Sequence, residues 1–319
     1  MNNSVSGEIK RLEIHISYSC GNNCVFCSER NRLKKFSSLD LSGPEIAGIL
    51  RDRRKSGFSH VTFTGGEPSL SPALPAALGA AKALGYKTCV TTNGLGFANA
   101  PYARRVVPLL DEAILSCHGA SEKTHDALTG KNGSFAAFLA ALANLSGAGG
   151  KRLYLMVNTV VTKKNVSQLP RILRRISGFG AVKHYLVSYP APEGGACAGY
   201  GELAVDLNEL RGHVRGLSVR ARSSGITLRF FGVPACALGE QASASNDFYY
   251  SPRLTVERAA LPGGGYGLKE TASYRPTRRR VYLKSCSPCR LRKSCGGIFR
   301  KYLRVFPGRI GVFRPAGVV

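Results

Sequence analysis

The segment RLEIHISYSCGNNCVFCSER, residues 11–30, joins a strand-like run to three closely spaced cysteines. The run RLEIHISYS is apolar and carries β-branched residues, as strands commonly do. Cys20, Cys24 and Cys27 follow it in the pattern CxxxCxxC. Three thiols on one loop indicate a metal site that keeps one position open for a further ligand.

The compartment decides how these cysteines are interpreted. The first residues, MNNSVSGEIKRLEIH, are polar and contain neither the apolar core nor the cleavage site of a signal peptide. No stretch approaches the roughly 18 apolar residues that a membrane span needs. We therefore expect a cytoplasmic protein without membrane contact, whose ten cysteines form metal sites more readily than disulfides.

Composition sets wider bounds. The chain has 319 residues, of which 44% are hydrophobic, enough for one large core and a small satellite region. Its 45 Lys and Arg against 19 Asp and Glu give a net charge of +26. This charge indicates either a polyanionic partner or acidic substrate, or merely a solvated basic surface. The two interpretations weigh equally, because the basic residues are dispersed and few aromatic residues interleave them.

Strand-like and helix-like segments alternate along most of the chain, which predicts an α/β fold with a parallel sheet. The predicted strands are residues 12–17, 60–64, 87–92, 112–117, 152–162, 183–189 and 226–233. From about residue 237 the alternation stops, and we expect loops with one hairpin around PGGG, residues 262–265.

Unusual polar and glycine residues gather where the predicted strands end. TGGEP (64–68), TTNG (91–94) and SCHG (116–119) close three of them, YPAPEGG (189–195) closes another, and Asn158 lies within the fifth. Parallel α/β barrels build their sites at the carboxyl ends of strands, so this shared placement predicts one site.

In these features the chain resembles the radical S-adenosylmethionine (radical SAM) enzymes over residues 8–235, with Phe26 placed before the last cysteine of the motif. The resemblance implies a partial (β/α)6 barrel in which Cys20, Cys24 and Cys27 hold a 4Fe-4S cluster. It also implies that S-adenosylmethionine binds the open iron and is cleaved reductively to a 5′-deoxyadenosyl radical, which abstracts hydrogen from a substrate. A zinc site is the alternative, with His15 or His118 as a distant fourth ligand.

The same resemblance assigns cofactor-binding residues. Gly65, Gly66 and Glu67 correspond to a loop whose backbone accepts the methionine ammonium group, and Phe26 flanks the adenine together with residues 186–188. By the same resemblance, Asn93, Ser116 and Asn158 bind the ribose and the methionine carboxylate. Asn158 is almost as readily explained as a buried amide whose hydrogen bonds are satisfied within the protein. His118 either contacts the cofactor or completes the barrel rim.

A second cysteine group, KSCSPCRLRKSC, places Cys286, Cys289 and Cys295 in a small irregular region over residues 236–319. It resembles part of the SPASM and twitch extensions, which hold auxiliary 4Fe-4S clusters. Phe299 stands where the full pattern has another cysteine, so we expect one auxiliary cluster with Cys236 as its fourth ligand. A four-cysteine zinc knuckle is the alternative.

Three cysteines remain. We expect Cys89 in the core, and Cys117 either in the core or beside the cofactor. Cys197, on a glycine-rich loop at the barrel mouth, is a candidate catalytic hydrogen donor or a substitute ligand of the auxiliary cluster, against the simpler interpretation of an ordinary loop cysteine.

The substrate is the least determined feature. The resemblance favours a peptide or protein, with an electron donor such as flavodoxin or ferredoxin. An anionic nucleotide, a sugar or tRNA is the second hypothesis, although nucleic acid is not favoured. A non-catalytic iron-sulfur scaffold is the third, and the retained GGEP segment, Asn93 and Ser116 argue against it.

Overall fold

A computed structural model describes residues 9–150, 152–309 and 313. Its main feature is a curved nine-stranded sheet in the order β7-β6-β5-β4-β3-β2-β1-β8-β9, in which every neighbouring pair is parallel except β8 and β9. The strands are β1 (Arg11–Ser17), β2 (His60–Gly65), β3 (Lys87–Thr92), β4 (Glu112–Ser116), β5 (Tyr154–Val160), β6 (Val182–Ser188), β7 (Thr227–Phe231), β8 (Arg253–Ala260) and β9 (Tyr266–Ser273).

The two faces of this sheet differ in chemistry. In β1, Leu12, Ile14 and Ile16 are fully buried on the outer face, whereas Glu13 and His15 point to the inner side and line a cavity. Alternation of this kind follows from the two-residue period of a strand. The outer face therefore supplies the hydrophobic core, and the inner face is free to carry polar groups.

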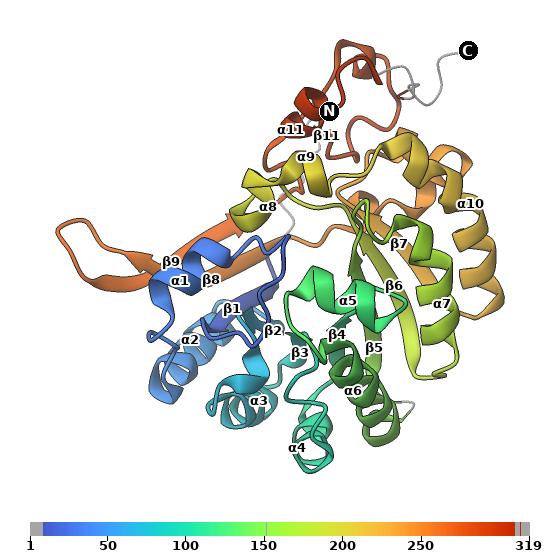
Figure 1. The fold of residues 1–319 in the computed structure, drawn as a ribbon. Coiled ribbons are helices and arrows are strands. Elements are labelled where there is room, and N and C mark those ends of the chain that lie inside the picture. The colour runs from blue at the N-terminus through green and yellow to red at the C-terminus, as the bar shows by residue number, and fades with distance from the viewer. Residues whose placement is uncertain (1–8, 151, 310–312, 314–319) are drawn as a thin grey trace.

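Helices cover the outer face (Figure 1). The helices are α1 (Arg30–Phe36), α2 (Gly43–Lys55), α3 (Leu74–Ala83), α4 (Ala100–Val106), α5 (Glu122–Thr129), α6 (Ser134–Gly149), α7 (Leu169–Ser177), α8 (Gly194–Ala198), α9 (Tyr200–Leu203), α10 (Leu207–Ser223) and α11 (Arg300–Val305). Of these, α8, α9 and α11 lie beside the C-terminal region and not on the outer face. Short 3-10 helices are η1 (Pro68–Leu70), η2 (Val107–Leu109), η3 (Val166–Gln168), η4 (Ala235–Ala244), η5 (Asn246–Tyr249) and η6 (Lys284–Cys286). Within the described residues, no helix has both the length and the hydropathy that crossing a bilayer requires.

Local sequence explains the helix positions. A capping box starts α2, where the side chain of Ser42 accepts from Glu45 N and the Glu45 carboxylate accepts from Ser42 N. In α7, Leu169, Ile172, Leu173 and Ile176 recur at helical spacing, and all four are buried. Both helices thus turn one apolar stripe toward the sheet.

The structure confirms the predicted α/β class with its mainly parallel sheet, all seven predicted strands and the C-terminal hairpin. The sequence did not predict that β8 of this hairpin pairs in parallel with β1 and so extends the main sheet. The main sheet contains seven consecutive parallel strands, β1 to β7, whereas the (β/α)6 barrel implied by the resemblance has six. The division at residues 235/236 stays a prediction, and its outer ends at residue 8 and at 310–312 and 314–319 lie outside the described residues.

The C-terminal region is fastened to the barrel by a buried ion pair. Arg280 lies at the start of the short strand β10 (Arg280–Val281), which pairs with β11 (Ile298–Phe299). Its guanidinium contacts Asp247 of η5 at 2.7 Å, with the two side chains 1% and 0% exposed. Asp247 also accepts a hydrogen bond from Gly296 N. One carboxylate therefore joins three segments below the second cysteine group.

Candidate functional site

The loop that carries Cys20, Cys24 and Cys27 lies between β1 and α1 and is held by backbone hydrogen bonds. Asn23 N donates to Thr129 O at 2.8 Å and Val25 N to Leu128 O at 3.0 Å, so the end of α5 supports the loop. Phe26 packs edge-on against His118, with ring centroids 4.6 Å apart. These contacts fix the direction in which the three thiols point.

The three thiols are neighbours and are partly buried. Burial, together with the nearby Cys27 and Cys20, raises the pKa of Cys24 to about 12, and burial raises the pKa of Cys20 to about 11. These thiols therefore hold their protons at neutral pH until a metal displaces them.

The spacing of the sulfurs favours a group larger than one ion. Across the part of the chain that the structure describes, no three cysteine Sγ atoms lie within 4.8 Å of one another. Tetrahedral zinc with Zn–S bonds of about 2.3 Å would bring its sulfurs to about 3.8 Å apart. An iron-sulfur cube accepts wider spacing, because each thiolate binds a different iron.

A glycine loop meets this cysteine loop through backbone alone. Gly66 N donates to Ser17 O at 2.6 Å, and Glu67 N donates to Ser19 O at 2.8 Å. A Cβ atom at Gly66 would lie less than 3.0 Å from the Ser19 carbonyl oxygen, and Gly65 has a φ of 116°. Only glycine allows this approach.

The Glu67 carboxylate holds the site together from below. It accepts hydrogen bonds from Ser69 N at 3.0 Å, Ser69 Oγ at 2.6 Å, Thr92 Oγ1 at 2.6 Å and Asn93 N at 2.6 Å. The side chain is completely buried, and burial raises the pKa of its carboxyl group although the four donors act against this. Glu67 thus acts on a ligand only through its backbone and through Asn93.

Asn93 connects this carboxylate to the cysteine loop. Its Nδ2 donates to Cys20 Sγ at 3.6 Å, and its Oδ1 accepts from Leu95 N. Ser116 and Asn158 pair across β4 and β5, and Ser188 Oγ donates to Asn158 Oδ1 at 2.7 Å. The predicted cofactor-binding residues of β3, β4 and β5 therefore follow one another around the inner end of the sheet.

Two histidines near this end are parts of the framework. His118 Nδ1 accepts from Val160 N at 3.2 Å, and His125 Nδ1 accepts from His118 N at 3.2 Å. Burial holds the pKa of His118 well below its usual value, and burial likewise lowers that of His125 to about 4. Of the two interpretations of His118, the contacts support the one in which it completes the rim.

Two cavities open on the inner side of the sheet. One of about 600 Å³ is lined by Thr91, Met156, Leu186 and Ser188. The other, about 840 Å³, lies at the mouth between β1, β8, β9 and the C-terminal region. The sequence did not predict the charged residues of this mouth, because the pairing of β8 with β1 has no local sequence signal. These residues are Glu13, Glu29, Arg32, Arg253 and Glu257.

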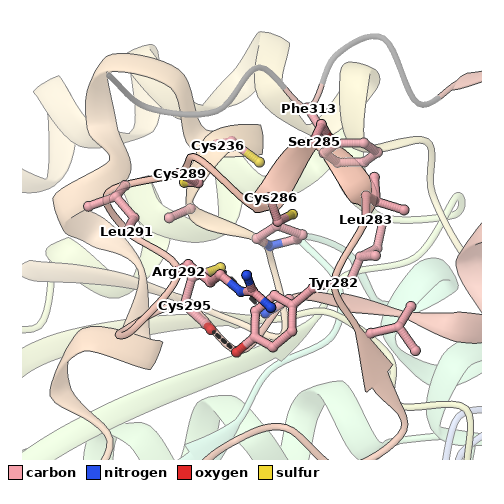
Figure 2. A pocket seen from close by; sticks show the side chains of 15 residues that line it. Cys236, Tyr282, Leu283, Ser285, Cys286, Cys289, Leu291, Arg292, Cys295 and Phe313 are labelled. Carbon is pink, nitrogen blue, oxygen red and sulfur yellow. Dashed lines mark hydrogen bonds between the residues drawn. The ribbon is translucent and has the colours of Figure 1, made fainter. Parts of the chain in front are cut away.

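The cysteines of the second group lie close together in the C-terminal region. Cys236, Cys286, Cys289 and Cys295 line one cavity (Figure 2), and burial with the three neighbouring thiols raises the pKa of Cys236 to about 12. Gly297 N donates to Cys295 Sγ at 3.4 Å. Cys197 does not line this cavity: it belongs to α8, and Lys301 Nζ lies 3.6 Å from its Sγ.

The other two cysteines are buried on opposite faces of the sheet. Cys117 lies in the hydrophobic core, and its Sγ donates to Gly119 O. Cys89 is buried among the hydrophobic residues, as expected, and its side chain also borders the 600 Å³ cavity. Residue 89 follows the inward phase of β3, which composition alone did not reveal.

Comparison with known proteins identifies the relatives of this chain. A family model described as the radical SAM superfamily matches residues 14–176. A probable GTP 3′,8-cyclase of Saccharolobus solfataricus is 25% identical over 219 residues, which cover 66% of this chain and 67% of the relative.

Solved structures show the same fold. SuiB of Streptococcus suis bound to S-adenosylmethionine aligns over 97% of this chain and 76% of its own, with a TM-score of 0.63 and 18% identity. SuiB bound to its precursor peptide SuiA aligns over 78% of this chain with a TM-score of 0.59 and 19% identity. In that complex the match spans 57% of the SuiB chain.

A glycine-to-alanine substitution, which adds one methyl group, tests the close contact between the glycine loop and the cysteine loop. Gly66→Ala should lower the free energy of unfolding by about 1–3 kcal/mol, because its Cβ meets backbone that no side-chain rotation can relieve. Gly79→Ala, in α3 with open space around the Cβ, should be neutral or stabilising by up to about 1 kcal/mol. Urea unfolding of both variants measures the difference, and equal stabilities would contradict the tight approach.

Proposed function

The chain belongs to the radical SAM superfamily and is an enzyme, and from this premise we propose that it abstracts hydrogen from a peptide or protein substrate. The observation that carries the proposal is the meeting of the three-cysteine loop, the Gly65–Glu67 loop and Asn93, together with the 840 Å³ cavity, which reaches Ser28 directly after Cys27. A substrate in that cavity would lie next to the end of the cysteine loop.

The residues present fit the cofactors of this family. Cys20, Cys24 and Cys27 provide three thiols and no fourth, and the glycine loop packs against the backbone of Ser17–Ser19, directly before Cys20. When bound, the 4Fe-4S cluster and S-adenosylmethionine supply a carbon-centred radical by reductive cleavage. The chain itself would hold and orient these cofactors and exclude water from them.

Each cofactor-binding residue then has a physical task. The carbonyl groups of the glycine loop accept hydrogen bonds from the ammonium group. The N–H groups of Gly66 and Glu67 already donate to the carbonyl oxygens of Ser17 and Ser19. Asn93 and Ser116 serve the ribose and carboxylate, Asn158 is aligned by Ser188, and Phe26 covers the adenine. Glu67 is a positioning residue, since its carboxylate reaches only protein groups.

A peptide substrate is supported by the shape of the mouth. Strand β9 ends the order of the main sheet, so one of its edges has no partner strand within the described residues. Residues 271–273 of the same strand line the 840 Å³ cavity. A peptide added as a further strand would therefore pass beside the cavity, a common mode of peptide binding. The fold shared with SuiB, solved with its precursor peptide, agrees with this proposal.

A nucleotide is the second candidate, and two observations favour it. The curated relative is a probable GTP 3′,8-cyclase, and the net charge of +26 suits a polyanion. The mouth itself is mixed, because Glu13, Glu29, Glu193 and Glu257 line it together with its basic residues. Its lining sets these four carboxylates against six basic side chains, Arg32, Arg253, Lys269, Arg275, Arg278 and Arg280, so the charge of the mouth favours neither candidate.

The second cysteine group completes the proposal. We assign Cys236, Cys286, Cys289 and Cys295 to one auxiliary 4Fe-4S cluster, with reducing electrons from a flavodoxin or ferredoxin in the cytoplasm. Cys197 remains our candidate hydrogen donor, because α8 places it next to the cysteine loop, where Gly195 N donates to Cys27 O at 2.8 Å.

The chemistry can be checked without knowing the substrate. With dithionite, anaerobically reconstituted protein should release 5′-deoxyadenosine from S-adenosylmethionine, and Cys24→Ala should abolish the release by removing a cluster ligand. Cys117→Ala, a cysteine of the core, should retain it. Chromatography of the products measures both, and a fully loaded wild type that neither binds nor cleaves the cofactor would replace this proposal with the scaffold hypothesis.

Metal content tests the auxiliary group. Two 4Fe-4S clusters correspond to about eight irons per chain, and Cys286→Ala combined with Cys289→Ala should reduce this to about four. Elemental analysis gives the number of irons per chain. Cys24→Ala is the matched variant, because it should remove the irons of the other cysteine group. Stoichiometric zinc in protein purified without oxygen would instead make the second group a zinc knuckle.

Salt dependence separates the substrate classes. A tRNA substrate requires many phosphate contacts, so its affinity would fall by orders of magnitude between about 50 and 200 mM salt. We expect bulk tRNA to bind only weakly at the higher salt, as measured by fluorescence anisotropy. Nanomolar binding that is lost when Arg290, Arg292 and Lys293 are neutralised would overturn the preference for a peptide.

A further inference from the structure

A compact group of ionisable side chains lies in the mouth of the barrel, apart from the cysteines. The parallel pairing of β1 with β8 sets Ile14 beside Val256 and so brings His15 near Glu257. Glu29 joins them from the turn before α1. Their ligand atoms all lie within 4.8 Å of one another, which holds for no other such trio among the described residues.

His15 has a buried nitrogen without a partner. The residue is 6% exposed, and its Nδ1 makes no hydrogen bond. Nδ1 faces Glu29 Oε2 at 3.7 Å and Glu257 Oε2 at 3.8 Å, too far for hydrogen bonds. Buried polar atoms are normally satisfied, so this gap requires an explanation.

The gap is close to the size of a metal coordination site. A metal ion bound to nitrogen and oxygen at about 2.1 Å each separates the two atoms by about 3.4 Å at a tetrahedral angle and about 3.0 Å at a right angle, so the observed gaps are slightly wider than those of a filled site. A proton on Nδ1 explains the geometry less well, because it would draw one carboxylate into hydrogen-bond distance. Both carboxylates stand back from Nδ1 by nearly equal amounts, as they would around a shared centre.

The surrounding charges orient these three ligands. On the far side of the imidazole, Glu13 Oε1 lies 3.8 Å from Nε2. Although burial opposes ionisation, His15 and Arg253 hold the pKa of Glu13 at about 2, so this carboxylate stays charged. At 3.8 Å this carboxylate is beyond hydrogen-bond distance of Nε2, so it acts on the imidazole through its charge, on the side where a metal-binding histidine usually has its outer partner.

Arg32 orients the other two ligands. Its Nη1 donates to Glu29 Oε2 at 3.0 Å and its Nη2 to Glu257 Oε1 at 2.6 Å. This leaves Glu257 Oε2 directed toward His15. Ligating carboxylates are ordinarily hydrogen-bonded in this way.

The charge balance leaves room for a cation. Glu13, Glu29 and Glu257 face the guanidinium groups of Arg32 and Arg253, so one negative charge is uncompensated while His15 is neutral. A proton is the competitor for this place, since the carboxylates raise the pKa of His15 against the effect of burial. A proton would balance this single charge by itself. A divalent ion leaves one net positive charge, but it gives the unpartnered Nδ1 and both carboxylates a common partner.

We propose that His15, Glu29 and Glu257 bind one divalent transition-metal ion of the Mn²⁺, Fe²⁺ or Zn²⁺ class at the barrel mouth. One imidazole and two carboxylates suit these ions. All three residues line the 840 Å³ cavity, so the remaining coordination positions face the space in which a substrate oxygen would bind. The site is additional to both cysteine groups and does not depend on the identity of the substrate.

The test uses Mn²⁺ as the probe, because its hard character makes thiols poor competitors. Anaerobically purified full-length protein, with its clusters oxidised and loosely bound metal removed, is titrated with Mn²⁺ while the free ion is followed by electron paramagnetic resonance. Wild type should bind one Mn²⁺ per chain. His15→Gln and Glu257→Gln should each weaken binding by more than tenfold, and Glu13→Gln by about 10- to 100-fold.

Matched controls make the outcome decisive. Glu193→Gln changes another carboxylate of the same cavity, paired with Arg278 and Arg279, and should leave Mn²⁺ binding unchanged. Cys286→Ala with Cys289→Ala should also leave it unchanged. Circular dichroism verifies that each variant is folded, and Glu257→Gln provides a second, nearly isosteric variant should His15→Gln fail to fold.

Two results would overturn the metal site. One is a folded wild type that takes up no Mn²⁺, and the other is unchanged uptake by both His15→Gln and Glu257→Gln. Neither result bears on the proposed function, because cleavage of S-adenosylmethionine is measured separately and through the cysteines.

Discussion

The close backbone contact between Gly65–Gly66 and Ser17–Ser19 is the constraint on which the site depends. It joins the end of β2 to the end of β1 through main-chain hydrogen bonds, with no side chain between them. The Glu67 carboxylate then fixes the next strand, because it accepts from Asn93 N, and Asn93 reaches Cys20. Three strand ends are thereby set relative to one sulfur, in a region where buried groups allow little adjustment.

The division of the sheet into two faces explains how one chain provides both stability and a site. The outer face is almost wholly apolar and packs against helices, so it supplies the hydrophobic free energy of folding. The inner face carries charged and polar side chains in partly open cavities. Such groups are costly to bury, and the outer face compensates for that cost.

Sequence patterns predicted whatever depends on local order. The period of the apolar residues located β1 to β7, and the spacing of Cys20, Cys24 and Cys27 predicts the first metal site. Features that depend on pairing between distant segments were not predictable. The parallel alignment of β8 with β1 has no local signal, so the group around His15 was missed and His15 entered only as a distant zinc ligand. Glu67 was assigned to the cofactor through its backbone, and the burial of its carboxylate is a further feature that a motif cannot show.

Cys236 stands apart in the chain from the cysteines with which it shares a cavity. It follows directly on β7, whereas Cys286 lies 50 residues later, after the β8–β9 hairpin. A metal group bound by both would close the intervening chain into a loop, much as a disulfide does, and a closure of this length is worth about 4 kcal/mol in chain entropy. The closed loop contains the hairpin that walls the barrel mouth. Oxidative loss of that group would therefore lower the free energy of unfolding of the region that carries this hairpin, although the group itself lies outside the mouth.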